Sequence, residues 1–408
     1  MNPTKTTIKP AIILFFALVL TAATTIAAPA KKMQLTLEAD LGELILEMSN
    51  QPGDVLLNNA LAATNVQRNK SALSYIDLFE KTYREQTKNA NLSALFVKKN
   101  ERGIAINSTN KVVTQYLKKE SMLALKIIAR IMEERLQEKG IVSPEVSVNS
   151  DKGIIKVSIE YIGDSVGIVQ YLSATGAFGI YEVYNNEDMI QSLFAMNDSL
   201  AQLPEIRKRR LSLPANTTQE MALFIRENPL FSVLYPMMGD SNKVMTGPVS
   251  GSLMQSEKAT LNQYLGLPTA RKFLPTDAQV MYGHPATPLD TILLVYVVKI
   301  PESGLGTINN EHIVTAYKEQ SQADANEYTA VIKMHAPGTA AWAAMTGKNV
   351  GRYIVFTLDD EVYSCPRVVG AITEGMTEIS AHLSKQEAED IANLLKYGKL
   401  PLAVHVIK

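Results

Sequence analysis

The sequence is poor in the side chains that most often cross-link a chain or bind metals. It contains one cysteine, Cys365, and five histidines among its 408 residues. A single thiol cannot form a disulfide within the chain, and a zinc site built from cysteines is excluded. The histidines show no i, i+4 pair, so no metal site is predicted. Because Cys365 lies between an expected strand and Pro366, it is expected to be a small buried hydrophobic residue.

Motifs of catalysis and nucleotide binding are also missing. There is no phosphate-binding loop, no G-x-S-x-G and no H-E-x-x-H, and Gly304-Leu305-Gly306 lacks the third glycine of a dinucleotide fingerprint. No pair of carboxylates stands out for acid–base work. The net charge of −1 gives no general attraction to nucleic acid or to anionic membranes. We therefore expect a protein that is not an enzyme, carries no cofactor and binds no nucleic acid.

A long apolar run occurs only near the N-terminus. Lys5 and Lys9 precede the apolar residues 11–20, and small residues follow up to Ala28-Pro29-Ala30. This order is typical of a secretory signal peptide. Residues 11–30 just reach the roughly 20 residues that a membrane span needs, although threonines make them less apolar. The sequence thus predicts a signal peptide over residues 1–30, or an uncleaved anchor through residues 11–30, ahead of an exported body.

The C-terminal sixty residues carry the clearest local signals. An apolar, β-branched run over 353–358 precedes Asp359-Asp360, a two-residue turn signal, and a second short strand over 361–364. Pro366 ends that strand, because proline cannot donate to a strand ladder. Ser384 and Glu387 form a capping box for a helix that Gly398 ends. These signals predict a β-hairpin followed by a capped helix.

The remaining chain alternates between strand and helix patterns. We expect helices at 121–139, 310–317 and 337–347, a β-hairpin over 145–159, and strands at 33–38, 178–184, 293–299 and 328–334. Residues 186–275 are mostly helical and polar, and their basic run at 207–210 is expected to be a solvated helix end. Trp342 is expected to be a core anchor, and the loop methionines Met237 and Met238, with Met245 and Met254, are interpreted as packing residues rather than a soft peptide-binding surface. The pattern predicts an α+β fold.

The C-terminal stretch resembles the first periplasmic region of SecD, the accessory subunit of the Sec protein translocase. The matching head positions are Gly351, Arg352, Asp359, Ser364, Pro366 and Gly375. A second block resembles the base subdomain of this family at Arg135, Gly140, Glu160 and Gly163. Most of these positions have a simple interpretation as turn or strand-end requirements. Arg352 is the best candidate for a functional contact, because a charge that opens an apolar strand needs a partner or solvent.

The chain departs from the family pattern at several turns. Asp359-Asp360 replaces Asp-Gly, which predicts a looser hairpin, because aspartate adopts the left-handed conformation less readily than glycine. Ser380-Ala381 replaces Ser-Gly, and Tyr161-Ile162-Gly163 replaces Leu-Pro-Gly. The Asp-Leu-x-Gly-Gly motif is missing, and Lys408 ends the chain where the second membrane helix of the family begins. The resemblance therefore implies a stand-alone exported protein without the transmembrane bundle.

The resemblance implies an α+β architecture with a ferredoxin-like base over 31–190. A helical or loop insertion follows over 191–277, then a smaller head over 278–383, and then a segment over 384–408 whose helix and strand return to the base. It further implies a periplasmic protein that binds unfolded preprotein or another polypeptide and assists export, alone, on the Sec translocon or with a separate SecDF membrane half. The alternative is an envelope protein-interaction module that keeps the fold but has no export role.

Overall fold

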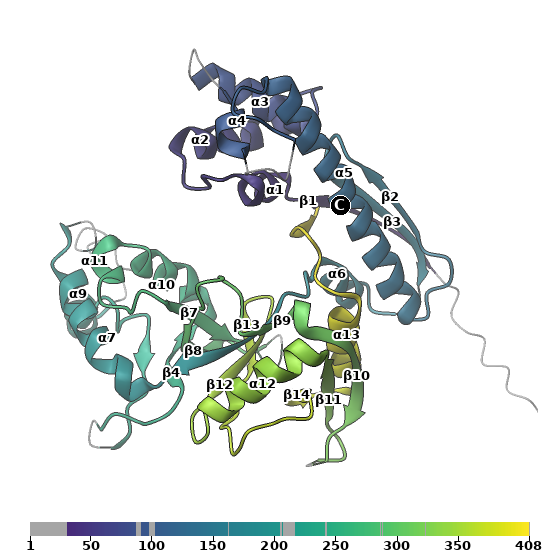
Figure 1. The fold of residues 1–408 in the computed structure, drawn as a ribbon. Helices are drawn as coiled ribbons and strands as arrows, with labels where there is room; N and C mark the ends of the chain where they lie inside the picture. Colours follow the sequence, from purple (N-terminus) through teal and green to yellow (C-terminus); the bar gives the residue numbers. More distant parts are fainter. Residues whose placement is uncertain are drawn as a thin grey trace, which may run out of the picture.

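The computed structural model describes residues 31–86, 91–97, 103–161, 163–204, 206, 217–240, 243–285, 287, 289–322 and 324–407. The predicted signal segment 1–30, the basic run 207–210 and Ile162 lie outside the described residues. Two bodies are visible in Figure 1, one around α5 and β1–β3, the other around α12, α13 and the remaining strands. Within the described part of the chain, no helix combines the length and the apolar character needed to cross a membrane.

The first body, which we call the base, is built on an antiparallel sheet of four strands in the order β15-β1-β3-β2. These are β1 (Lys31–Ala39), β2 (Glu145–Asn149), β3 (Ile154–Tyr161) and β15 (Val404–Val406). Helix α5 (Asn110–Glu138) packs against this sheet and buries one stripe of apolar side chains, including Leu125, Ile128 and Met132. The short helix α6 (Ser165–Ser173) begins at Asp164, whose carboxylate accepts the amide hydrogens of Val166 and Gly167.

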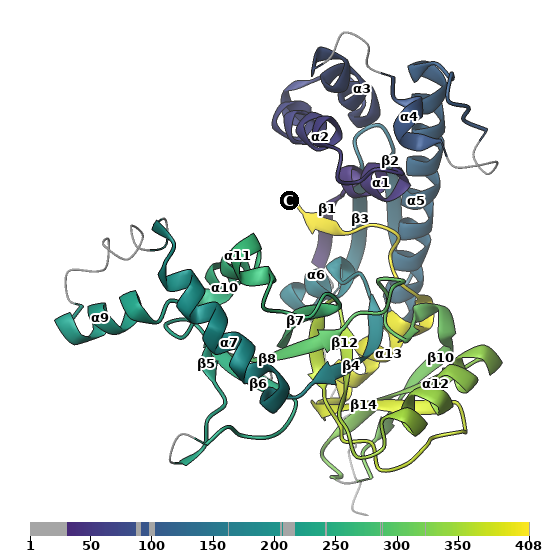
Figure 2. The ribbon, with the colours of Figure 1, turned by 60° about the vertical axis from the view of Figure 1, so that its left-hand side comes forward.

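Short helices cover the N-terminal half of α5 at the far end of the base (Figure 2). They are α1 (Leu41–Met48), α2 (Val55–Gln67), the 3-10 turn η1 (Arg68–Lys70), α3 (Tyr75–Gln86) and α4 (Ser93–Phe96). Asp40 and Asp54 cap α1 and α2, because their side chains accept the free amide hydrogens of the first helical turn. The buried residues of these short helices, among them Leu57 and Phe79, belong to the same core as the base sheet.

The second body contains a closed ring of five strands. The ring runs β4–β12–β13–β7–β8 and closes because β8 also pairs with β4. Its members are β4 (Phe178–Tyr184), β7 (Ala278–Gly283), β8 (Ile292–Lys299), β12 (Ile354–Leu358) and β13 (Glu361–Ser364). One side of the ring carries a core of its own, with Tyr181, Tyr296, Val298 and Val355. Strand β9 (Ile308–Asn309) extends from β4, and β6 (Val249–Met254) and β5 (Tyr235–Pro236) extend from β8.

A second sheet stands beside the ring in the order β10-β11-β14. It consists of β10 (Ile313–Gln320), β11 (Tyr328–Met334) and β14 (Met376–Leu383), all antiparallel. Helix α12 (Ala336–Lys348) and helix α13 (Lys385–Tyr397) pack on it, α13 mainly against β10 and β11. The predicted capping box of α13 is confirmed, since Ser384 accepts the amide hydrogen of Glu387 and the Glu387 carboxylate accepts that of Ser384. Trp342 on α12 is buried, as predicted.

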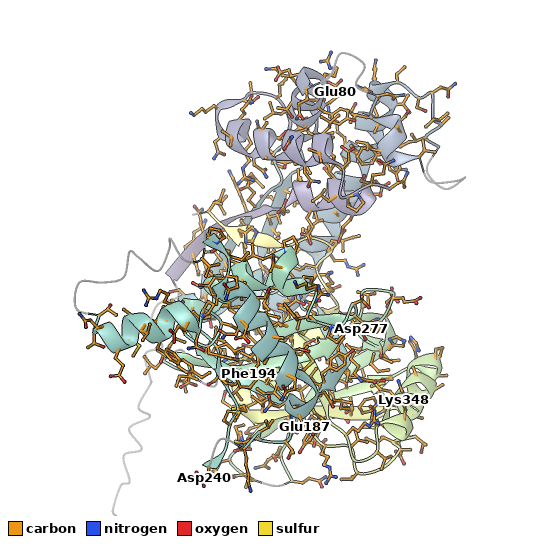
Figure 3. The ribbon with its side chains drawn as sticks, turned by 90° about the vertical axis from the view of Figure 1, so that its left-hand side faces the viewer. Glu80, Glu187, Phe194, Asp240, Asp277 and Lys348 are labelled. Atoms are coloured by element: carbon orange, nitrogen blue, oxygen red, sulfur yellow. The ribbon has the colours of Figure 1, made fainter. Side chains whose placement is uncertain are left out.

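The described residues between 186 and 271 form a largely helical insertion with its own core. Its helices are α7 (Asn186–Ala201), α9 (Gln219–Glu227), the 3-10 turn η3 (Gln255–Glu257), α10 (Lys258–Leu265) and α11 (Pro268–Arg271). Leucines and methionines of α7 meet alternate residues of β6 and β8, including Leu253, Leu293 and Val295. Figure 3 looks onto this insertion, with Phe194 of α7 toward the viewer and Glu80 of α3 at the opposite end of the molecule from Asp240.

The structure differs from the sequence prediction in three places. The helix expected at 310–317 is a 3-10 turn, η4 (Asn310–His312), followed by strand β10, because the β-branched run Ile313-Val314-Thr315 favours an extended strand, which pairs with β11. Strand β4, assigned to the base, pairs with β12, β8 and β9 of the second body. The C-terminal segment divides, since α13 packs mainly on the β10–β11 sheet and β15 alone adds a strand to the base sheet.

Candidate functional site

The head motif positions surround the β12–β13 hairpin. Its two turn residues, Asp359 and Asp360, have φ values of 52° and 63°, the left-handed conformation that a two-residue hairpin turn requires. The Asp359 carboxylate accepts the amide hydrogen of Ala177 at 2.8 Å and the hydroxyl hydrogen of Thr175. The Asp359 amide donates in turn to the Ala177 carbonyl at 2.8 Å. These contacts fix the turn to the loop that leads into β4.

Gly351 and Arg352 lie where the chain enters β12. Gly351 has a φ of 79°, and its amide donates to the Val368 carbonyl at 2.7 Å. The Val368 amide donates to the Arg352 carbonyl at 2.8 Å, and Arg367 Nε donates to the Gly351 carbonyl. The Arg352 guanidinium is exposed and forms no ion pair with the described carboxylates. The charge of Arg352 is therefore exposed to solvent and is not paired with a partner among the described residues.

Gly375 stands immediately before β14 and is required by its surroundings. Its φ is 67°, and its carbonyl accepts the amide hydrogen of Met334 at 2.8 Å. A side chain at this position would overlap the side chain of Thr339 on α12. The glycine therefore allows β14 to start close against α12, which makes it a structural position.

Arg135 of the base has the most informative environment among the motif positions. Its side chain is completely buried, and Nη1 donates to the Ala174 carbonyl at 2.7 Å. Nη2 donates to the carbonyls of Thr175 at 3.3 Å and Gly398 at 3.1 Å. Burial lowers the pKa of Arg135 to about 10, so the group is charged at neutral pH. Helix α5 thus holds both chain segments that connect the base with the second body.

Thr175 links the two motif blocks. Its carbonyl accepts a hydrogen bond from Arg135, and its hydroxyl donates to Asp359. The neighbouring Gly176 has a φ of 77°, and a Cβ there would lie 3.0 Å from Arg135 Nη2. The structure therefore brings Arg135 and Asp359 together through one loop, a relationship that the sequence motifs did not predict.

The other base positions are local. Gly140 ends α5 with a φ of 77°, and the amide of Ile141 reaches back to the Leu136 carbonyl at 3.1 Å, as expected for a left-handed helix end. Glu160 is exposed on β3 opposite Lys32. A side chain at Gly163 would overlap the ring of Tyr161. The neighbours found for these three positions all lie within the base.

A hollow of about 740 Å³ lies between β13, the loop after it, α12 and β14. We call it the head hollow. Its lining is mostly apolar and includes two head motif positions. The lining residues include Trp342, Ser364, Cys365, Pro366, Val369 and Ile372, with Val249, Leu294 and Tyr296 from β6 and β8. Burial raises the pKa of the Cys365 thiol to about 12. Ser364 and Pro366 therefore belong to the wall of a cavity as well as to a strand end.

Trp342 lines the head hollow and carries a buried donor. Its ring meets Phe356 edge-on, with ring centroids 6.0 Å apart. The side chain is 1% exposed, and the indole N–H has no hydrogen-bond partner among the described residues. A buried donor without an acceptor costs free energy.

Strand β14 contributes another wall of the head hollow. It pairs with β11 on one side and is the last strand of its sheet within the described part of the chain. Residues along β14 line the hollow, among them Thr377, Ser380 and His382. An outer strand offers main-chain donors and acceptors to a further extended segment. The head hollow thus combines an apolar wall with a sheet edge.

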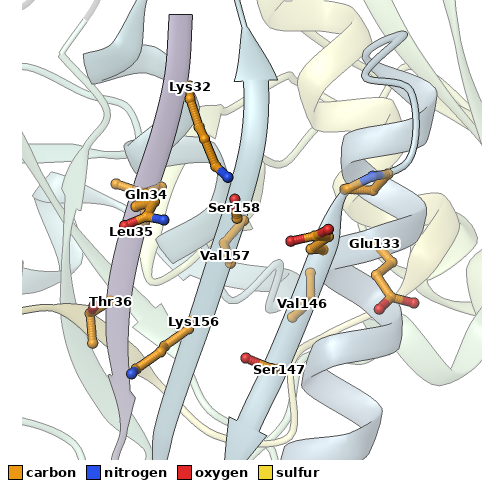
Figure 4. Close-up of a pocket in the computed structure, with 12 residues that line it drawn as sticks. Lys32, Gln34, Leu35, Thr36, Glu133, Val146, Ser147, Lys156, Val157 and Ser158 are labelled. Carbon is orange, nitrogen blue, oxygen red and sulfur yellow. The ribbon is translucent and has the colours of Figure 1, made fainter.

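A second hollow, of about 720 Å³, lies on the base sheet (Figure 4). Lys32, Gln34 and Thr36 of β1 stand beside Lys156 and Ser158 of β3, with Ser147 on β2. Polar side chains alternate outward here, as on a solvated sheet face. In the described ranges, no three histidine, cysteine, aspartate or glutamate side chains are grouped so that they could hold a metal ion. The head hollow is therefore the stronger candidate for a binding site.

Comparisons with known proteins also find similarity to SecD and SecDF proteins. Residues 303–402 match the model of the SecDF P1 head subdomain. The protein translocase subunit SecD of Rhodothermus marinus is 26% identical over 393 residues, which are 92% of this chain and 60% of that protein. SecD of Mycobacterium tuberculosis is 37% identical over 79 residues, which are 19% of this chain and 14% of that protein. The resemblance to SecD is confirmed, and the chain spans about 60% of its Rhodothermus relative.

A solved structure of SecDF in a super-membrane-facing form is also similar. The match covers 70% of this chain and 28% of the SecDF chain, with 15% identity and a TM-score of 0.38. Six of the ten motif positions lie within the matched range 303–402, and the four base positions precede it. The head motif positions are thus the ones that the family model includes.

Proposed function

Since this chain is similar to SecD over most of its length and matches the SecDF P1 head subdomain, we propose that it acts in protein translocation. In this proposal it is a SecD-like protein of the periplasmic face, exported by its N-terminal segment or anchored there by residues 11–30. Its function is to bind and position a polypeptide, and it performs no catalysis. The observation that carries the finer proposal is the apolar head hollow beside the outer strand β14.

We propose that the head hollow binds an extended stretch of unfolded polypeptide. Apolar side chains of the client enter between Trp342, Val369 and Ile372, where their burial from water is favourable. The client backbone pairs with the free edge of β14, whose main-chain hydrogen bonds do not depend on sequence. This combination suits a protein that must accept many different clients.

The base is proposed to be a ferredoxin-like support for the head. The strand order β15-β1-β3-β2, with α5 between β1 and β2, supports this assignment. Its partner in the envelope is the Sec translocon or a separate SecDF membrane half. The alternative, an envelope module with no export role, has no observation in its favour.

The test is binding of a permanently unfolded, fluorescently labelled polypeptide to the purified exported chain, measured by fluorescence anisotropy. The double variant V369D/I372D places two charges in the head hollow and is expected to weaken binding at least tenfold, because an apolar client side chain that docks there must desolvate them. Val369 is 94% exposed, whereas Ile372 is half-buried against the core, so the fold of the double variant is checked directly. The matched control is Val350→Asp, at a position that is 52% exposed and outside the hollow.

Two results would contradict the proposal. One is the absence of measurable binding by the wild-type chain. The other is an equal loss of affinity in V369D/I372D and in the Val350→Asp control. Circular dichroism and thermal melting of all three proteins establish that each variant is folded.

A further inference from the structure

Four large side chains form an exposed apolar face on strands β5, β6 and β8. Tyr235 is 53% exposed, Met254 39%, Ile292 60% and Leu294 41%. We call these four residues the strand shelf. Isolated exposed apolar residues are common on protein surfaces, whereas a contiguous group often marks a binding site.

Strand register places the four side chains on one face. Met254 pairs with Ile292, Ser252 pairs with Leu294, and Tyr235 pairs with Ser252. Because side chains alternate along a strand, residues paired directly or two apart point the same way. The alternate residues, Leu253, Leu293 and Val295, are buried in the core of the insertion. One face of this sheet is therefore covered by helices, and the other carries the strand shelf.

The strand shelf is continuous with the head hollow. Leu294 belongs to both, since it also lines the hollow together with Tyr296 and Val249. Tyr296 lies two residues beyond Leu294 on the same face of β8, and Val249 pairs with Tyr296. A chain that leaves the hollow past Leu294 therefore reaches Ile292 and Met254 without crossing a polar surface.

We propose that the strand shelf is a second subsite for the same extended polypeptide that occupies the head hollow. This inference rests on the proposed function and sets the length and composition of the preferred client. The shelf measures about 7 Å along β8, from the rise of two residues, and about 10 Å across three strands. It therefore takes about two or three further apolar side chains of a client. The preferred client carries two apolar clusters, one for the hollow and one for the shelf.

Continuity with the head hollow favours a polypeptide over other occupants. None of the four shelf residues is basic, whereas a site for an anionic membrane surface combines apolar and basic side chains. All four residues also precede residue 303, where the match to the SecDF P1 head subdomain begins. The matched subdomain alone therefore supplies most of the lining of the hollow and none of the shelf.

The experiment compares two peptides on the full exported chain. A peptide of about six residues with one apolar cluster spans about 20 Å, and a peptide of about fourteen residues with two clusters spans about 46 Å. The shelf variant is I292T/M254T, and V369D/I372D is the hollow variant. The matched control is Val314→Thr on β10, which is 58% exposed and lies in a different sheet from the shelf. Threonine keeps a strand preference at all three positions.

If the shelf binds the client, I292T/M254T lowers the affinity for the long peptide at least about fivefold and leaves the affinity for the short peptide unchanged. The hollow variant lowers the affinity for both peptides, and Val314→Thr changes neither affinity. Equal affinities of I292T/M254T and wild type for the long peptide would overturn the shelf while the effect of V369D/I372D still supports the proposed function. Loss of self-association in I292T/M254T, seen by light scattering without a change in peptide affinity, assigns the shelf to a second copy and also overturns the inference.

Discussion

The carboxylate of Asp359 accepts the amide hydrogen of Ala177 at 2.8 Å, although 182 positions separate the two residues. The same loop receives hydrogen bonds from Arg135, so a hairpin of the second body and a helix of the base meet at Thr175 and its neighbours. The base and the second body also share one continuous hydrophobic core, which includes Leu394 and Leu395 of α13. The junction is therefore a packed, hydrogen-bonded structure.

The two aspartates of the hairpin turn are expected to respond oppositely to glycine. Asp360→Gly relieves a left-handed aspartate at an exposed position and is expected to raise the free energy of unfolding by about 0.5 kcal/mol. Asp359→Gly removes the acceptor for Ala177 and Thr175 and is expected to lower it by about 1–2 kcal/mol. Urea unfolding measures both, and equal effects of the two substitutions would disprove the assignment.

Replacement of Arg135 is expected to loosen the junction. In Arg135→Met the carbonyls of Ala174, Thr175 and Gly398 lose their donor in a buried site, which costs about 3 kcal/mol in unfolding free energy. Hydrogen exchange should rise first at residues 174–177 and 398–400. Arg130→Met, at an exposed position on the same helix with only an i, i+4 ion pair, is the control and should change neither quantity.

Stability is expected to fall at low pH through Glu361. The hydrogen bond from His284, at 2.7 Å, holds the pKa of Glu361 below 4.5, with a further contribution from Lys258, although burial opposes it. A carboxyl whose pKa is lowered on folding stabilises the protein above its unfolded pKa and loses that contribution as the pH falls through the folded pKa. The stabilisation is therefore present above pH 4.5 and is lost below it.

Urea midpoints between pH 7 and pH 3 test this contribution. Glu361→Gln should lower the midpoint at pH 7 and should approach the wild type at the acid end, where the wild-type carboxyl is protonated. Glu319→Gln, at an exposed position on β10, is the matched control. A constant difference between Glu361→Gln and wild type across the range would exclude the His284–Glu361 contact as its source.

Cys365 reports on occupancy of the head hollow. Burial raises its pKa from 9.0 to about 12, which lowers the thiolate fraction at neutral pH by about a thousandfold and slows alkylation accordingly. An unfolded polypeptide in the hollow is expected to slow iodoacetamide labelling further, as measured by mass spectrometry. Labelling as fast as in the urea-unfolded chain would show that the thiol is not buried.

The predictions that succeeded concern residues whose partners are near in sequence. Ser384 and Glu387 cap α13 across three residues, and Asp359-Asp360 closes a hairpin between adjacent strands. The prediction for Asn310–Tyr317 was wrong because tertiary pairing decides it: β10 is held by β11, whereas its side-chain pattern alone also fits a helical face. Similarly, β4 has a strand pattern that says nothing about which sheet it joins.

The candidate site was less predictable for the same reason. Ser364 and Pro366 were named from the family motif, but the head hollow also needs Trp342 from α12 and Leu294 from β8. Alternation in residues 292–296 indicates one exposed face, yet only the register with β6 brings Ile292 beside Met254. Arg135 was named as a motif position, and its role follows from three carbonyls that lie 39 to 263 positions away.

Strands β1 and β15 also determine how the molecule carries mechanical load. They are antiparallel neighbours, with Leu37 opposite Val406 and Ala39 opposite Val404, so the short β15 pairs with the last three residues of β1 (Figure 2). A force that separates residues 32 and 407 peels β15 from β1 one pair at a time across three pairs, the geometry of an opening zipper. Because the second body lies between these two strands in sequence, the applied force does not load it until β15 has detached.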